Sequence, residues 1–158
     1  MHTLLVLLYS KKHRVRMARI NVEIPGHTHF EATIPVRITD LNYGAHLGND
    51  ALLSILHEAR MQLLQHYGYS ELNLGGASLI MADVAISYKG EGFYGDVLTI
   101  KLAFNDLNKY GFDITYHVLN QEGREVARAK TGMLCFDYKE RKLMSLPGEV
   151  KAKIETIA

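Results

Sequence analysis

The chain has 158 residues, 47% of them hydrophobic and 22% charged, and a formal net charge of +1 at pH 7. This length and composition predict one globular domain with a sizeable core, and the near-neutral charge argues against the strong positive field of a nucleic-acid-binding or membrane-surface protein. The single cysteine, Cys135, excludes an internal disulfide and is consistent with a reducing, cytoplasmic location.

The N-terminal end holds an apolar run, Leu4–Tyr9, that is too short to cross a bilayer. Basic residues follow this run, whereas a secretory signal carries them before it. Met17 is a second plausible start. We therefore expect residues 1–16 to be an N-terminal tail or a misassigned start, and residues 17–158 to form a single domain with neither a membrane nor a nucleic-acid partner.

Residues 30–39 alternate between apolar and polar side chains, which predicts a strand with one buried face. Pro35 cannot donate a hydrogen bond to a neighbouring strand, so this strand is expected at an edge of the sheet. The apolar positions that should share the buried face are Phe30, Ala32, Ile34, Val36 and Ile38.

A long helix should follow, with Asn49 or Asp50 as its N-cap, an end near Tyr67, and Gly68 as its stop signal. A helix that is apolar on more than one face is buried. The apolar positions are Leu52, Leu53, Ile55, Leu56, Ala59, Leu63 and Leu64.

Four more strands are predicted after the helix, joined by short connections, and a short helix is predicted after Pro147. The order of elements indicates an α+β domain in which a long central helix is wrapped by a curved antiparallel sheet of five strands. In the first of the four strands we expect one face to carry Ile80, Ala82, Val84, Ile86 and Tyr88. The strands are expected at about Ser78–Lys89, Val97–Asn105, Phe112–Leu119 and Val126–Tyr138.

Three local motifs accompany this order of elements. The segment Asp40–Asp50 (DLNYGAHLGND) resembles the pattern D-x-D-x-x-G-H-V-N-N-A, with Asp40, His46 and Asn49 in register. Glu58-Ala59-Arg60 resembles E-x-A-R, and Tyr88–Ile100 (YKGEGFYGDVLTI) resembles Y-x-x-P-x-x-Y-G-D-x-L-x-V. Together, over about residues 30–147, they resemble the hotdog-fold thioesterases of the 4-hydroxybenzoyl-CoA thioesterase group.

The resemblance implies a hotdog fold and hydrolysis of acyl-CoA, or of an acyl-carrier-protein thioester, without a cofactor. It also implies a homodimer with the site between subunits, and pairs of such dimers, that is homotetramers, are common in the group. By register with the group, the backbone N–H of Asn49 is the expected oxyanion donor at the helix N-terminus.

The catalytic carboxylate of the group's aspartate-dependent members is the second Asp of D-x-D, where this chain has Asn42. A neutral amide cannot act as a general base or as a carboxylate nucleophile, but it can hydrogen-bond a water molecule or the thioester, so Asn42 stays among the expected catalytic residues. Three residues remain as replacements: Glu58 on the helix, His46 in the loop, and Asp40, which also fits a turn-capping role. The expected substrate contacts are Tyr43, Gly48, Asp50 and Met81, although Asp50 is equally explained as a favourable helix-dipole charge and Met81 as core or tunnel lining.

Two other functions stay open. Asn42 motivates a non-catalytic acyl-CoA or acyl-carrier binding protein. Asp40-Leu41-Asn42 also begins like the D-x-N-P-x-H motif of hotdog enoyl-CoA hydratases, although His46 comes one residue late and Tyr43 replaces the proline. His27 and His29 are two residues apart, a spacing that places both on one face of a strand, but a pair without a third ligand is weak evidence for a metal, so none is expected.

Overall fold

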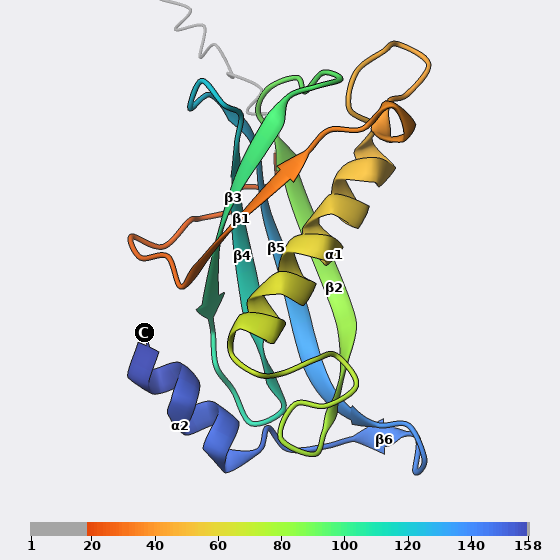
Figure 1. Ribbon diagram of the computed structural model, residues 1–158. Coiled ribbons are helices and arrows are strands. Elements are labelled where there is room, and N and C mark those ends of the chain that lie inside the picture. The colour runs from red at the N-terminus through yellow and green to blue at the C-terminus, as the bar shows by residue number, and fades with distance from the viewer. Residues whose placement is uncertain (1–18, 158) are drawn as a thin grey trace, which may run out of the picture.

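The computed structural model describes residues 19–157, so the expectations for residues 1–16 and for Met17 lie outside the described residues. Figure 1 shows the long helix α1 lying across one face of a twisted sheet, with the shorter helix α2 at one end. The elements in chain order are β1 (Phe30–Pro35), the short 3-10 helix η1 (Ile38–Asp40), α1 (Asn49–His66), β2 (Ser78–Tyr88), β3 (Val97–Asn105), β4 (Gly111–Leu119), β5 (Glu125–Asp137), β6 (Lys142–Leu143) and α2 (Gly148–Ile157).

The strands form one antiparallel sheet in the order β1-β3-β4-β5-β2. β1 and β2 are therefore the two edge strands, which confirms the edge position expected from Pro35. The sheet also has a sixth strand that the sequence did not predict, because the two residues of β6 pair with the end of β5. Two residues are too short for a periodic signal.

The core lies between α1 and the inner face of the sheet. In β1, β3, β4 and β5, alternate residues point inward and are almost fully buried, as the period-two pattern predicted, whereas most of β2 is exposed or half-buried. The buried positions of α1 are Leu52, Ile55, Leu56, Ala59, Arg60, Leu63 and Leu64. Arg60 is the one charged residue among them, and it needs a partner to be tolerated there.

The first strand ends earlier than its pattern predicted. β1 stops at Pro35, and the chain then turns into η1, so Ile38 is 66% exposed rather than on the buried face. Pro35 has no N–H with which to extend the ladder. After it, the N–H of Val36 donates to the carbonyl oxygen of Asp96, at 2.8 Å, instead of to another strand.

The start of α1 also differs from the prediction. The N-cap is Gly48, no side chain caps the helix, and Asn49 is its first residue. A side chain at Gly48 would collide with the Asp50 carboxylate, because an ideal Cβ there lies 2.7 Å from Asp50 Oδ1. The end agrees with the prediction, since His66 is the last helical residue and Gly68 has a positive φ of 81°.

The expected face of β2 is partly wrong. Ala82 has no partner on β5 and forms a β-bulge. Because side chains alternate between the two faces of a strand, each residue beyond the bulge lies on the face opposite to the one predicted. Met81 before the bulge and Val84 after it therefore both lie opposite buried residues of β5. Ile80 and Ala82 leave the predicted set, and the face that continues the inner side of the sheet carries Leu79, Met81, Val84, Ile86 and Tyr88.

Within residues 19–157, no helix combines the length and the apolar character needed to cross a membrane.

Candidate active site

Asp40 secures the start of the central helix. Its carboxylate accepts hydrogen bonds from the Arg37 backbone N–H at 2.8 Å and from the guanidinium nitrogens Nε and Nη2 at 3.2 and 3.0 Å. These bonds to Arg37 lower the pKa of Asp40, although burial opposes the shift. Its carbonyl oxygen accepts the Gly48 N–H at 2.8 Å. Asp40 is thus occupied as a turn-capping carboxylate, one of the two roles the sequence left open.

Asn42 shapes the loop that precedes the helix. Its side-chain Oδ1 accepts the backbone N–H groups of Gly44 at 2.9 Å and of His46 at 3.3 Å, and its own N–H donates to the His46 carbonyl at 2.8 Å. Ala45 closes the turn with a φ of 61°, a left-handed value that is strained for a residue with a Cβ. An aspartate at position 42 has the same acceptor oxygen, so the turn does not require the amide.

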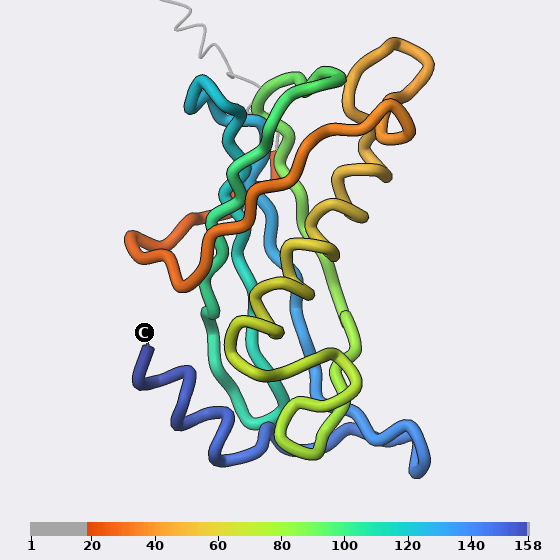
Figure 2. Tube along the Cα trace, viewed as in Figure 1, coloured from red at the N-terminus to blue at the C-terminus, as the bar shows by residue number. Residues whose placement is uncertain are grey.

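A second loop, residues 89–96 between β2 and β3, lies beside this turn. Figure 2 shows both loops at the end of the molecule where α1 begins. The Leu47 N–H donates to the Gly92 carbonyl at 2.8 Å, and the Phe93 ring contacts the His46 ring at a tilt of 44°, with centroids 5.1 Å apart. The contact at Gly92 is close, since a Cβ there would lie 3.1 Å from the Leu47 side chain.

Between the two loops and the first turn of α1 lies a hollow of about 370 Å³, which we call the helix-end pocket. Among the described residues, no acceptor contacts the backbone N–H of Asn49, as expected in the first turn of a helix. That N–H, with the positive end of the helix dipole, suits a developing negative charge. The pocket is lined by Asn42, His46, Leu47, Gly48, Asn49, Leu52, Tyr88, Gly90, Glu91, Gly92 and Val126.

His46 stands in this pocket with a carboxylate beside it. Its Nδ1 lies 3.2 Å from Glu91 Oε1. A carboxylate at Nδ1 favours the tautomer that leaves Nε2 as a proton acceptor. Sequence reasoning selected His46 but missed Glu91, whose only signal was that it replaces the proline of the Y-x-x-P-x-x-Y-G-D pattern.

Tyr88 was noted in a motif but not predicted as a site residue. Its hydroxyl donates to the Asn49 carbonyl oxygen at 3.3 Å, which ties the end of β2 to the first turn of α1. Burial, and then the nearby negative charge of Asp50, raise the pKa of Tyr88, so the phenol stays protonated at neutral pH. Asp50 is therefore close to the pocket, although it does not line it.

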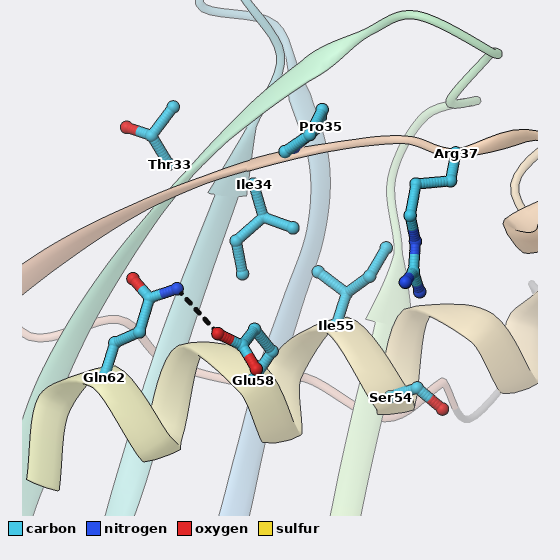
Figure 3. A pocket seen from close by; sticks show the side chains of 8 residues that line it. All are labelled: Thr33, Ile34, Pro35, Arg37, Ser54, Ile55, Glu58 and Gln62. Atoms are coloured by element: carbon cyan, nitrogen blue, oxygen red, sulfur yellow. Dashed lines mark hydrogen bonds between the residues drawn. The ribbon is translucent and has the colours of Figure 1, made fainter. Parts of the chain in front are cut away.

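Glu58 lies elsewhere. It lines a separate hollow of about 380 Å³ between β1 and α1, where Figure 3 shows it bonded to Gln62, 2.9 Å from Nε2 to Oε1. Glu58 comes nine positions after Asn49 in α1, which is about 13 Å along the helix axis and about half a turn round it. The structure therefore brings Asn42, His46, Gly48 and Asn49 together and leaves Glu58 out.

Arg60 in the same motif is buried, and its contacts are internal. Its Nε donates to Glu71 Oε1 at 2.7 Å, and its Nη1 lies 3.5 Å from the hydroxyl of Tyr116. Burial opposes the charge of Arg60, but Tyr116 and Glu71 outweigh it and leave its pKa raised. The second carboxylate oxygen of Glu71 contacts His57 Nε2 at 3.1 Å. The E-x-A-R motif thus joins α1 to the loop before β2.

The remaining predicted contacts lie outside the pocket. Tyr43 is fully exposed in the turn, and Met81 is 41% exposed on the edge strand β2. His27 and His29 precede β1 and are not on a strand, contrary to the prediction, and their rings lie with centroids 4.7 Å apart and planes tilted by 55°. No group of three or more potential metal ligands occurs in the part of the chain that the structure describes.

Comparison with known proteins decides the family. Residues 36–154 match the profile of the thioesterase-like superfamily. The chain belongs to this superfamily. It is 29% identical over 127 residues to FadM, the long-chain acyl-CoA thioesterase of Escherichia coli K12, with 79% of this chain and 96% of FadM covered. The motif resemblance and the expected enzyme class, a thioester hydrolase, are thereby confirmed.

Solved structures of other proteins have the same architecture. Slr0204, a 1,4-dihydroxy-2-naphthoyl-CoA thioesterase from Synechocystis, superposes with a TM-score of 0.71 at 23% identity, covering 79% of this chain and 93% of its own. The DHNA-CoA thioesterase from Staphylococcus aureus gives 0.73 at 16% identity, with 80% and 91% covered. These likenesses confirm the α+β hotdog fold.

Proposed function

We propose that this chain hydrolyses acyl-CoA thioesters in the helix-end pocket. The observation that carries the proposal is the meeting of an uncommitted helix N-terminus with His46 in one hollow, in a member of a thioesterase superfamily. Thioester hydrolysis needs a hydrogen-bond donor for the carbonyl oxygen and a base that activates water. The backbone N–H at the helix N-terminus can be the donor, and the imidazole of His46 can be the base.

In the proposed reaction, the thioester carbonyl oxygen accepts a hydrogen bond from the Asn49 N–H. His46 Nε2 takes a proton from a water molecule, whose oxygen forms a bond to the carbonyl carbon. The tetrahedral intermediate then expels the sulfur, which receives the proton from His46, so that the products are a carboxylic acid and the thiol of CoA. Asn42 supports the loop, and Glu58 takes no part.

The choice of His46 among the three candidate bases follows from the neighbouring contacts. Asp40 is buried and fully engaged by Arg37. Glu58 lies in a different hollow. His46 is half-exposed, lines the pocket, and has a side chain suited to proton transfer near neutral pH.

We also propose a homodimer formed through β2, with a dimer of dimers as the larger expected assembly. β2 is an edge strand of 11 residues, and its exposed apolar side chains include Met81 (41%), Val84 (40%) and Tyr88 (49%). An unpaired strand with exposed apolar residues favours pairing with a second copy. Tyr88 lines the pocket, so such pairing would place the pocket beside the subunit interface. A cytoplasmic location stays a prediction.

The test is release of free thiol from a panel of short, long and aryl acyl-CoAs. Wild type should turn over at least one class, His46→Ala should lose about 100-fold or more in kcat, and Glu58→Gln should stay close to wild type. Loss of activity in Glu58→Gln with full activity in His46→Ala would overturn the assignment of the base.

Asn42 supports a second candidate, a non-catalytic acyl-CoA or acyl-carrier binding protein. In that case wild type binds acyl-CoA saturably without releasing thiol. Asn42→Asp then creates activity, because the new carboxylate can keep the hydrogen bonds from Gly44 and His46 while supplying a base. An active wild type that Asn42→Asp leaves unchanged excludes this candidate.

A further inference from the structure

Two departures from the thioesterase motifs meet at one residue, His46. At position 42 this chain has an amide where the pattern has a carboxylate, and at position 91 it has a carboxylate where the pattern has proline. Residues 42 and 91 are far apart in sequence, yet both contact His46. Asn42 Oδ1 accepts the His46 backbone N–H at 3.3 Å, and Glu91 Oε1 lies 3.2 Å from His46 Nδ1.

We propose that Glu91 is a positioning residue for His46. Its carboxylate keeps the imidazole proton on Nδ1, which leaves Nε2 to accept the proton of water, and it stabilises the imidazolium that this transfer creates. The inference rests on the proposed hydrolytic function and names the residue that makes His46 effective. No proton passes to Glu91: the proton on Nδ1 stays there, and the one on Nε2 goes on to the leaving sulfur.

The backbone holds Glu91 on both sides. The Gly90 N–H donates to the Val126 carbonyl at 3.1 Å, and the Gly92 carbonyl accepts the Leu47 N–H at 2.8 Å. Leu47 directly follows His46, so the second of these bonds fixes the carboxylate loop against the histidine loop. The Phe93 ring covers another side of the imidazole. Backbone bonds on both sides of Glu91 therefore hold its loop beside the loop of His46, and the two side chains meet at ion-pair distance.

The exposure of the Glu91 and His46 side chains distinguishes a role in catalysis from a role in the stability of the fold. The side chain of Glu91 is 67% exposed and that of His46 is 39% exposed, so the pair contributes little to folding. Among residues 19–157, Glu91 is the one acidic side chain at ion-pair distance from the His46 ring. Removing the Glu91 carboxylate should therefore change the tautomer of His46 and lower kcat, while the free energy of unfolding stays almost unchanged.

The experiment compares Glu91→Ala, Glu91→Gln, His46→Ala and the double variant Glu91→Ala/His46→Ala. Glu140→Gln is the matched control, because Glu140 is 65% exposed and lies 3.9 Å from its ion-pair partner Lys142. It belongs to the turn between β5 and β6, and Figure 1 shows β6 at the end of the sheet away from the start of α1. Rates of thiol release, thermal midpoints and the imidazole ¹⁵N shifts of His46 are measured for each protein.

Glu91→Ala should lower kcat by about 10- to 100-fold with little change in KM. Glu91→Gln should recover part of this loss, because its amide oxygen places a partial negative charge beside Nδ1–H. The double variant should be no slower than His46→Ala, because Glu91 acts only through the histidine. The thermal midpoints and the activity of Glu140→Gln should match wild type.

The ¹⁵N shifts test the same idea without turnover. Wild type should show the Nδ1–H tautomer of His46, and Glu91→Ala should show mainly Nε2–H. An unchanged tautomer, a kcat for Glu91→Ala within twofold of wild type, or a double variant much slower than His46→Ala would each overturn the proposal. A wild type that releases no thiol while the tautomer changes as expected would refute the hydrolytic function but not the pairing.

Discussion

The buried ion pair of the E-x-A-R motif gives the sharpest test of which motif residues are structural. Arg60 is only 4% exposed, and its guanidinium contacts Glu71 and Tyr116. Arg60→Met keeps a long apolar side chain but leaves the Glu71 carboxylate facing the protein without its partner. Removing one member of a buried pair costs about 3–5 kcal/mol. Since the Glu71 side chain is 24% exposed and also contacts His57, we expect about 3 kcal/mol, the lower end.

For a chain of this length, that loss corresponds to a fall in Tm of roughly 6–12 °C. Differential scanning calorimetry measures it, and urea unfolding gives the free energy independently. Tyr116 keeps its hydrogen bond to Thr131 Oγ1, at 3.0 Å, so the phenol should not add to the loss. The double variant Arg60→Met/Glu71→Met should be more stable than Arg60→Met, because no unpaired charge remains.

The reasoning is refuted if Arg60→Met loses less than about 1 kcal/mol, the range of an exposed ion pair. It is also refuted if Arg60→Met is as stable as wild type but inactive, since the motif would then serve the chemistry. Failure of the double variant to regain stability would show that the packing of the arginine stem matters more than its charge.

Three further predictions concern the backbone and one histidine. Ala45→Gly should raise the free energy of unfolding by about 0.5 kcal/mol, because relief of the left-handed strain at φ 61° exceeds the entropy cost of glycine, and urea unfolding should detect it. Gly111→Ala should lower the free energy of unfolding by about 3 kcal/mol or prevent folding, because its Cβ would collide with the backbone carbonyl oxygen of Met133, and thermal unfolding reports it. Burial first, and then His27, lower the pKa of His29, whose Nδ1 accepts the Phe104 N–H at 2.9 Å, so the folded state favours the neutral ring. The stability due to His29 is therefore fully present above the ordinary pKa of 6.5, and it is lost as the pH falls from 6.5 through the lower pKa of the folded state. His29→Gln should weaken this loss of stability in acid, which urea titrations from pH 7.5 to pH 5 measure.

Local patterns sufficed for most of the fold. The period-two runs placed β3, β4 and β5 to within a residue or so, because each strand buries one face and its alternation is therefore visible in the sequence. The apolar helix with Gly68 after it was predicted for the same kind of reason. The period-two pattern gave a wrong result at two places where a single residue interrupts a strand. The bulge at Ala82 exchanged the two faces of β2, and Pro35 ended β1 before Ile38.

The candidate site shows the same division. The sequence by itself determined that a polar turn, with Asn42 and His46, precedes the N-terminus of a buried helix, and that position 42 carries no carboxylate. Only the tertiary structure decided that Glu58 faces β1, away from the pocket, and that Glu91 lies beside His46. The physical reason is that contacts between distant segments depend on strand pairing and loop packing, here the bond from Leu47 to Gly92, which no local pattern of residues encodes.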